Sequence, residues 1–202
     1  GHDAGGNGVY SLAGIGTQDL VLGSTHDTVD FKMAESVAPD ESMTQSQVNV
    51  RGEMKLSGQV SVTATGLADD NRFDVTISKG ATIDNATLTL ANASFSGSGS
   101  VILGGTSALT LTNTEVSGFN GITVNNDASV TIALDNADLN ANVMLSSGTL
   151  SVSENGATIG DGNKIAVGSN ASVTLAGSVG GAGALELNGG SVSLEDGAAV
   201  EL

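Results

Sequence analysis

The triplet Leu88-Thr89-Leu90 returns five more times before the end of the chain, about once every 21 residues. The later copies are Leu109-Thr110-Leu111, Val130-Thr131-Ile132, Leu150-Ser151-Val152, Val173-Thr174-Leu175 and Val192-Ser193-Leu194. Alternation of apolar and polar residues with a period of two is typical of a strand with one buried side. A fixed period of this length is typical of a solenoid, in which each coil stacks on the next.

Two further sets of apolar residues keep the same spacing between these copies. One set is Val101-Ile102-Leu103, Ile122-Thr123-Val124, Val143-Met144-Leu145, Ile165-Ala166-Val167 and Leu185-Glu186-Leu187. The other, looser set is Phe95, Val116, Ala137 or Leu139, Ile159, Val179 and Val200. Gly, Asn, Asp and Ser turns separate the sets. The sequence therefore predicts an all-β parallel β-helix (β-solenoid) with about 21 residues and three short strands per coil. In each triplet the outer two residues should point inward and the middle residue outward.

The chain divides into a less regular and a more regular part. Residues 1–80 hold the only proline, Pro39, and shorter alternating stretches, which indicate an irregular N-terminal region, either a cap or early coils. Residues 81–202 form the regular solenoid. Because the sequence stops at Val200-Glu201-Leu202, within what reads as another strand, we expect a solenoid truncated at its C-terminus and cut from a longer repeat protein.

Composition and charge exclude several classes of function. The chain has 22 acidic and 6 basic residues, for a net charge of −16, which repels nucleic acid and anionic membrane surfaces. No run of 18 apolar residues is present, so we expect no membrane insertion by this chain. The lack of cysteine excludes disulfides and thiolate metal sites. Hydrophobic residues make up 39% and fall in alternating blocks, which argues against disorder.

The middle residues of the triplets predict one outward face that carries hydroxyl groups. They are Thr89, Thr110, Thr131, Ser151, Thr174 and Ser193. One interpretation is an ice-binding solenoid, in which rows of threonine organise water. The other is an ordinary solvated sheet, since Thr is favoured on exposed strands and stacked hydroxyls can bond one another. The mixture of Ser and Ala with Thr favours the second.

A polysaccharide-active β-helix enzyme is a further alternative. Hydrolysis needs carboxylates that converge across a groove, and elimination needs a basic residue near a metal-binding acidic cluster. The acidic pairs Asp135 and Asp138, and Glu195 and Asp196, lie in expected turns without a basic partner. The histidines, His2 and His26, lie outside the repeats. We therefore identify no catalytic residue and expect that the chain is not an enzyme.

A short N-terminal stretch resembles the nonapeptide repeat of calcium-binding β-rolls, Gly-Gly-x-Gly-x-Asp-x-apolar-x. Asp27 and Val29 match the Asp and apolar positions, and Asp19 with Val21 repeats them eight residues earlier. In that family the Asp carboxylate binds calcium and the apolar residue points inward. The resemblance implies a calcium site at Asp19 and Asp27, and hence a calcium-binding β-roll module as another alternative. The other interpretation is that both aspartates are solvated and bind no metal.

The stretch Gly181-Ala182-Gly183-Ala184-Leu185-Glu186-Leu187-Asn188-Gly189-Gly190-Ser191-Val192-Ser193-Leu194 resembles the repeat of bacterial autotransporter passengers and filamentous adhesins. In those families a secreted chain folds as a right-handed parallel β-helix outside the cell. The resemblance implies a non-catalytic fragment of an extracellular bacterial surface protein that acts in adhesion, self-association or display. We expect a protein or glycan surface partner, or self-association, and no cofactor other than the calcium discussed above.

Overall fold

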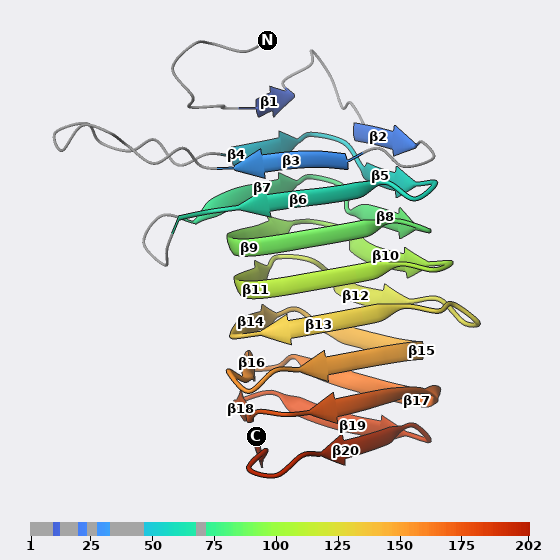
Figure 1. Cartoon of the computed structure of the whole chain (residues 1–202), viewed down its shortest axis with the longest axis vertical. Helices are drawn as coiled ribbons and strands as arrows, with labels where there is room; N and C mark the ends of the chain where they lie inside the picture. The colour runs from blue at the N-terminus through green and yellow to red at the C-terminus, as the bar shows by residue number, and fades with distance from the viewer. Residues whose placement is uncertain (1–9, 13–19, 24–27, 33–46, 68–71) are drawn as a thin grey trace, which may run out of the picture.

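The fold is an all-β solenoid built from parallel strands (Figure 1). The structure, a computed structural model, describes residues 10–12, 20–23, 28–32, 47–67 and 72–202. From Ala81 onward the chain makes about 6 turns of about 21 residues each. Val101, for example, pairs with Ile122, and Ile122 pairs with Val143, each 21 positions further along. The predicted fold class is confirmed.

Three strand stacks form the three faces of each coil. The first face contains β2 (Leu20–Gly23), β5 (Met54–Ser57), β8 (Ala81–Asp84), β10 (Ser100–Gly104), β12 (Gly121–Val124), the first halves of β15 (Val143–Val152) and β17 (Lys164–Leu175), and β19 (Ala184–Asn188). The second face contains β3 (Thr28–Lys32), β6 (Ser61–Thr65), the first halves of β9 (Thr87–Gly97) and β11 (Ala108–Ser117), β13 (Thr131–Asp135), the second halves of β15 and β17, and β20 (Ser191–Leu194). The third face contains β1 (Tyr10–Leu12), β4 (Gln47–Val50), β7 (Phe73–Ile77), the second halves of β9 and β11, β14 (Ala137–Asn140), β16 (Ala157–Ile159), β18 (Val179–Gly181) and β21 (Val200–Glu201).

The core follows the expected alternation along each strand. Leu88 and Leu90 of β9 are buried, whereas Thr89 between them is only half-buried. Small aliphatic side chains fill most of the interior, and two aromatic rings, Phe95 and Phe119, pack with their centroids 4.7 Å apart. Apolar side chains stacked at strand spacing bury a continuous core along the coils, which stabilises the solenoid.

The described strands before residue 81 belong to the same three stacks. Met54 of β5 pairs with Ala81, 27 positions later, and Leu20 of β2 pairs with Met54, 34 positions later. The early coils are therefore longer than the later ones. Among the described residues there is no helix of the length and apolar character needed to cross a membrane.

The structure corrects the predicted register in two places. In the third, looser set, Val179 pairs with Ala157, whereas Ile159 pairs with Gly181.

The other correction lies on the second face. The triplet that stacks on Leu109-Thr110-Leu111 is Ile132-Ala133-Leu134, and not Val130-Thr131-Ile132. Val124 stacks on Leu103, and Ile132 stacks on Leu109. The turn between Val124 and Ile132 is nevertheless two residues longer than the turn between Leu103 and Leu109. A shift of two residues keeps every side chain on its own side of the sheet, so the alternation of apolar and polar residues did not reveal it.

Candidate binding surface

The second face presents two columns of outward side chains that run along the stack of coils. The first column is Ser61, Thr87, Ala108, Thr131, Thr149, Ser172 and Ser191. The second column is Thr63, Thr89, Thr110, Ala133, Ser151, Thr174 and Ser193. All of these side chains except the two alanines carry a hydroxyl group. We call the two columns together the hydroxyl face.

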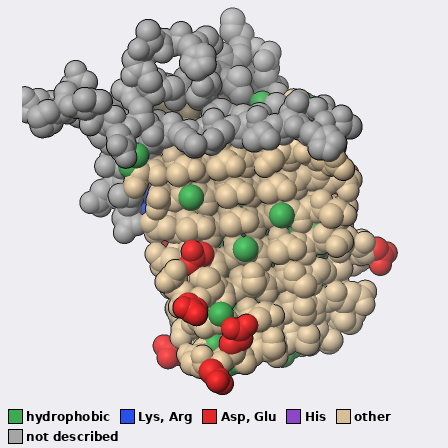
Figure 2. All heavy atoms as spheres, in the orientation of Figure 1, with side chains coloured by type: hydrophobic (Ala, Val, Ile, Leu, Met, Phe, Trp, Pro, Cys, Tyr) green, Lys and Arg blue, Asp and Glu red, His purple; other side chains and the backbone are tan. Residues whose placement is uncertain are grey.

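From β6 to β20 the hydroxyl face carries no charged residue, although the chain has a net charge of −16. One coil earlier, β3 places Asp30 next to Thr63 in the second column. Figure 2 shows the hydroxyl face over β9, β11 and β13 as an almost uniformly tan surface with scattered hydrophobic atoms, and acidic side chains gather toward its lower left border. The other two faces hold ion pairs. Lys164 pairs with Glu186 at 2.9 Å on the first face, and Arg72 approaches Glu115 of the third face at 3.5 Å. Charge is therefore absent from these two columns between β6 and β20, whereas Asp135 lies at the edge of the same face.

Most hydroxyl groups of this face are free to bond a ligand or water. Within the two columns only Thr174 and Ser193 form a side-chain hydrogen bond inside the protein, with their oxygens 3.3 Å apart. The expectation that stacked hydroxyls satisfy one another is wrong for the remaining members. Each hydroxyl can donate one hydrogen bond and accept two, so the face is a regular array of unused donors and acceptors.

Five of the six residues predicted to form the outward face share one column. Thr89, Thr110, Ser151, Thr174 and Ser193 lie in the second column. The sixth, Thr131, lies in the first column, because the longer turn before it shifts its register by two residues. Ala133 takes its expected place.

Asparagine residues form a ladder at the corner between the second and third faces, which sequence analysis missed. Asn92, Asn113 and Asn136 all have positive φ angles, between 47° and 51°, and their side-chain amides hydrogen-bond from coil to coil. Asparagine tolerates this left-handed conformation better than most residues. Its recurrence at spacings of 21 and 23 residues was a signal that could have identified the corner.

The acidic pair Asp135 and Asp138 does not converge on a common site. Asp135 ends β13 on the second face, and hydrogen bonds from Ser153 and from Asn155 lower the pKa of its carboxyl group below 3.8. Asp138 lies on the third face and accepts a hydrogen bond of 2.7 Å from Thr158. Each carboxylate is thus held by its neighbours in the next coil.

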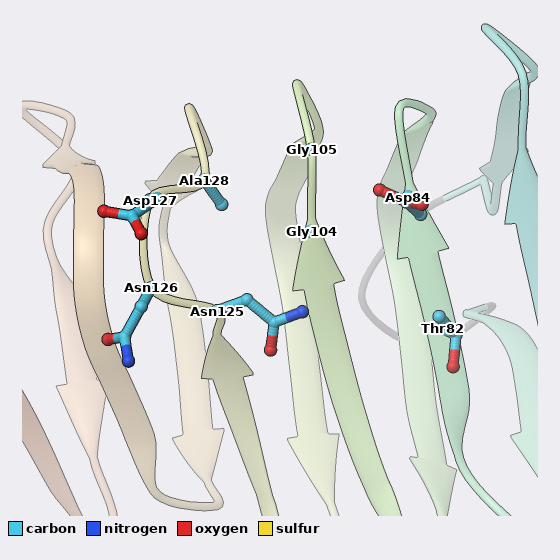
Figure 3. Close-up of a pocket in the computed structure, with 8 residues that line it drawn as sticks. All are labelled: Thr82, Asp84, Gly104, Gly105, Asn125, Asn126, Asp127 and Ala128. Atoms are coloured by element: carbon cyan, nitrogen blue, oxygen red, sulfur yellow. The ribbon is translucent and has the colours of Figure 1, made fainter.

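A shallow polar groove of about 250 Å³ lies at the corner between the first and second faces. Its lining comes from three successive coils: Thr82, Asp84, Gly104, Gly105, Asn125, Asn126, Asp127 and Ala128. Figure 3 shows Asp84 and Asp127 at opposite ends of this groove, with the two glycines and Asn125 between them. The groove contains two carboxylates, two carboxamides and a hydroxyl group, and no aromatic side chain.

The candidate calcium ligands Asp19 and Asp27 lie outside the described residues. Val21 lies within β2, however, and its side chain is 61% exposed. The β-roll resemblance requires this residue to point inward, so the match at Val21 is wrong. In the part of the chain that the structure describes, no group of three or more His, Cys, Asp or Glu side chains could hold a metal ion.

Comparison with known proteins found no counterpart. No protein-family model, no curated protein and no solved structure matches this chain.

Proposed function

We propose that this chain is a non-catalytic part of an extracellular bacterial surface protein, similar to autotransporter passengers and filamentous adhesins, that acts in adhesion, self-association or display. The observation that carries the proposal is the hydroxyl face. On a chain of net charge −16, two columns of outward positions are neutral over the seven strands from β6 to β20, and almost all of these positions carry a hydroxyl group. The resemblance of Gly181–Leu194 to passenger repeats supports the same proposal.

A contact surface of this kind benefits from the rigidity of the solenoid. Backbone hydrogen bonds between coils and the continuous core hold the columns at the strand spacing of about 4.8 Å. The hydroxyl groups are therefore ordered before a partner arrives, which lowers the entropy cost of binding. The neutral face also avoids the repulsion that the remaining acidic surface exerts on negatively charged cell surfaces.

Adhesion of protein-coated beads tests the proposal. The purified chain is coupled to fluorescent beads, and bead adherence to bacterial and animal cells and bead clustering are counted, with an unrelated acidic protein as the control. We expect beads that carry the chain to adhere or cluster more than control beads. Equal behaviour of the two kinds of bead would show that the proposed function is wrong.

A further inference from the structure

The polar groove is built by an unusually long turn that the protein holds in place. The turn that follows β12 starts at Asn125 and is two residues longer than the turn one coil earlier. The buried Oγ of Ser147, in the next coil, lies 2.8 Å from the carbonyl oxygens of both Asn125 and Ala128. The single hydroxyl proton of Ser147 is shared between these two carbonyl oxygens, so the next coil holds the longer turn, which forms one wall of the groove.

The floor of the groove is a glycine between two polar side chains. Asp84 pairs with Gly104 along the stack. On the other side of Gly104 lies Asn125, because the preceding residue, Val124, pairs with Leu103. A Cβ atom added at Gly104 would lie 3.2 Å from Asn125 Nδ2 and 3.2 Å from Asp84 Oδ1. The two side chains thus reach over Gly104 from the coils on either side, whose backbones are about 9.6 Å apart at ordinary strand spacing.

The chemistry of the groove favours an uncharged ligand rich in hydroxyl groups. Carboxylate oxygens accept hydrogen bonds, and a carboxamide both donates and accepts, which together match neighbouring hydroxyls of a sugar ring. The net charge of −16 disfavours an anionic ligand. A calcium ion would need several oxygens within about 2.6 Å, whereas Asp84 and Asp127 lie at opposite ends of the groove in Figure 3.

The turn that lines the groove leads directly into the hydroxyl face. Ala128 lines the groove, and Thr131 of the first column follows three residues later. The two columns cover about 400 Å² at ordinary strand spacing, which is half of what each partner buries in a typical stable interface, so the columns alone favour weak, repeated contacts over one tight contact. An extended polymer can use the groove and the columns together.

We propose that the groove binds one residue of a neutral polysaccharide, through Asp84 and Asn125, and that the polysaccharide continues over the hydroxyl face. This inference rests on the proposed function, because it names the partner class of the same surface. A site of this size without an aromatic platform gives weak binding for one sugar, and many weak contacts along a polymer give the retention.

Affinity electrophoresis in native gels tests this inference. Gels contain mannan, dextran or a soluble β-glucan, with alginate as an anionic comparison, and mobility is expressed relative to a gel without polysaccharide. We expect at least one neutral polysaccharide to retard the chain and alginate not to. The variant Asp84→Ala/Asn125→Ala should be retarded at least about fivefold less, because it loses several ligand hydrogen bonds.

Two control variants separate a lost site from a damaged fold: Gly180→Ala is the control for Gly104→Ala, and Asp138→Ala is the control for Asp84→Ala/Asn125→Ala. Gly104→Ala adds a methyl group at the groove floor, whereas Gly180→Ala adds one on the third face, where the nearest neighbour is the Glu201 carbonyl oxygen at 3.8 Å. Only Gly104→Ala should weaken retardation. Asp138→Ala, which removes a carboxylate from the third face, should leave it unchanged.

Each outcome decides the inference. Equal retardation of the wild-type chain and Asp84→Ala/Asn125→Ala, or no retardation by any neutral polysaccharide, would overturn it. Loss of retardation in EDTA would also overturn it, since a bridging cation would then carry the binding. If retardation is absent while beads coated with the chain still adhere, the glycan inference fails and the proposed function stands. If the beads also fail to adhere, the proposed function fails as well.

Discussion

Asn113 donates a hydrogen bond of 2.7 Å from its Nδ2 to Oδ1 of Asn92, which occupies the same corner one coil earlier. Asn136 donates in turn to Oδ1 of Asn113 at 3.1 Å, and Asn92 donates to the carbonyl oxygen of Gly66 at 3.3 Å. Each asparagine therefore has two roles at the corner. It supplies the positive φ that turns the chain, and it links its coil to the next.

The first prediction separates these two roles at Asn113. Asn113→Ala loses both the amide bonds and the tolerance for a φ of 47°, and should lower the free energy of unfolding by about 2 kcal/mol. Asn113→Gly keeps the tolerance and should cost only about 1 kcal/mol. Urea denaturation measures both. Asn126→Ala, in an exposed turn, is the control and should change stability little. Equal loss in the Ala and Gly variants would show that φ is not the reason for asparagine here.

The second prediction concerns the hydroxyl group that holds the long turn. Ser147→Ala removes the one O–H donor that the carbonyl oxygens of Asn125 and Ala128 share, and should destabilise the fold by about 1 to 2 kcal/mol. Hydrogen exchange should show faster exchange in the Asn125–Ser129 turn than in the wild-type chain. Unchanged exchange in this turn would mean that the turn holds its shape without Ser147.

The third prediction concerns the pH dependence of Asp135. Hydrogen bonds from Ser153 and from Asn155 lower its pKa in the folded state below 3.8. These bonds therefore stabilise the fold above about pH 3.8, and the contribution is lost as the pH falls through the lower folded pKa. Because the group is largely solvated, the contribution should be less than about 1 kcal/mol.

A carbon-13 NMR titration of the Asp135 carboxyl group measures this shift. Ser153→Ala removes the larger of the two causes and should raise the pKa toward 3.8, whereas Asn155→Ala should have a smaller effect. A titration midpoint of Asp135 at or above 3.8 in the wild-type chain would contradict the prediction.

Much of the fold could be predicted from the sequence because the core depends on a simple period. Apolar residues at alternate positions and at a spacing of about 21 placed Leu88, Leu109 and Leu150 in one buried column, as the structure confirms. What the period could not show was a change in turn length. The extra two residues before Ile132 moved Thr131 by one column without changing which way it points.

Neither the groove nor the lack of hydrogen bonds among most hydroxyl groups of the face could be predicted from sequence. The groove depends on how Asp84 and Asn125 lie over Gly104, which is a matter of side-chain direction at a corner. The hydroxyl face depends on the register of seven strands, so that its lack of charge is visible only when the columns are assembled. The asparagine ladder, by contrast, repeats in the sequence at the coil spacing and was overlooked there.

The most direct test of the central claim, that the hydroxyl face is the contact surface, is bead adhesion by two double variants. Thr89→Glu/Thr110→Glu places two carboxylates on this face, and Ser96→Glu/Ser117→Glu places two on the third face of the same strands, β9 and β11. We predict at least about fivefold lower adhesion for the first variant, because an unpaired carboxylate is costly to bury in a contact, and unchanged adhesion for the second. Equal adhesion by the two variants would contradict the account.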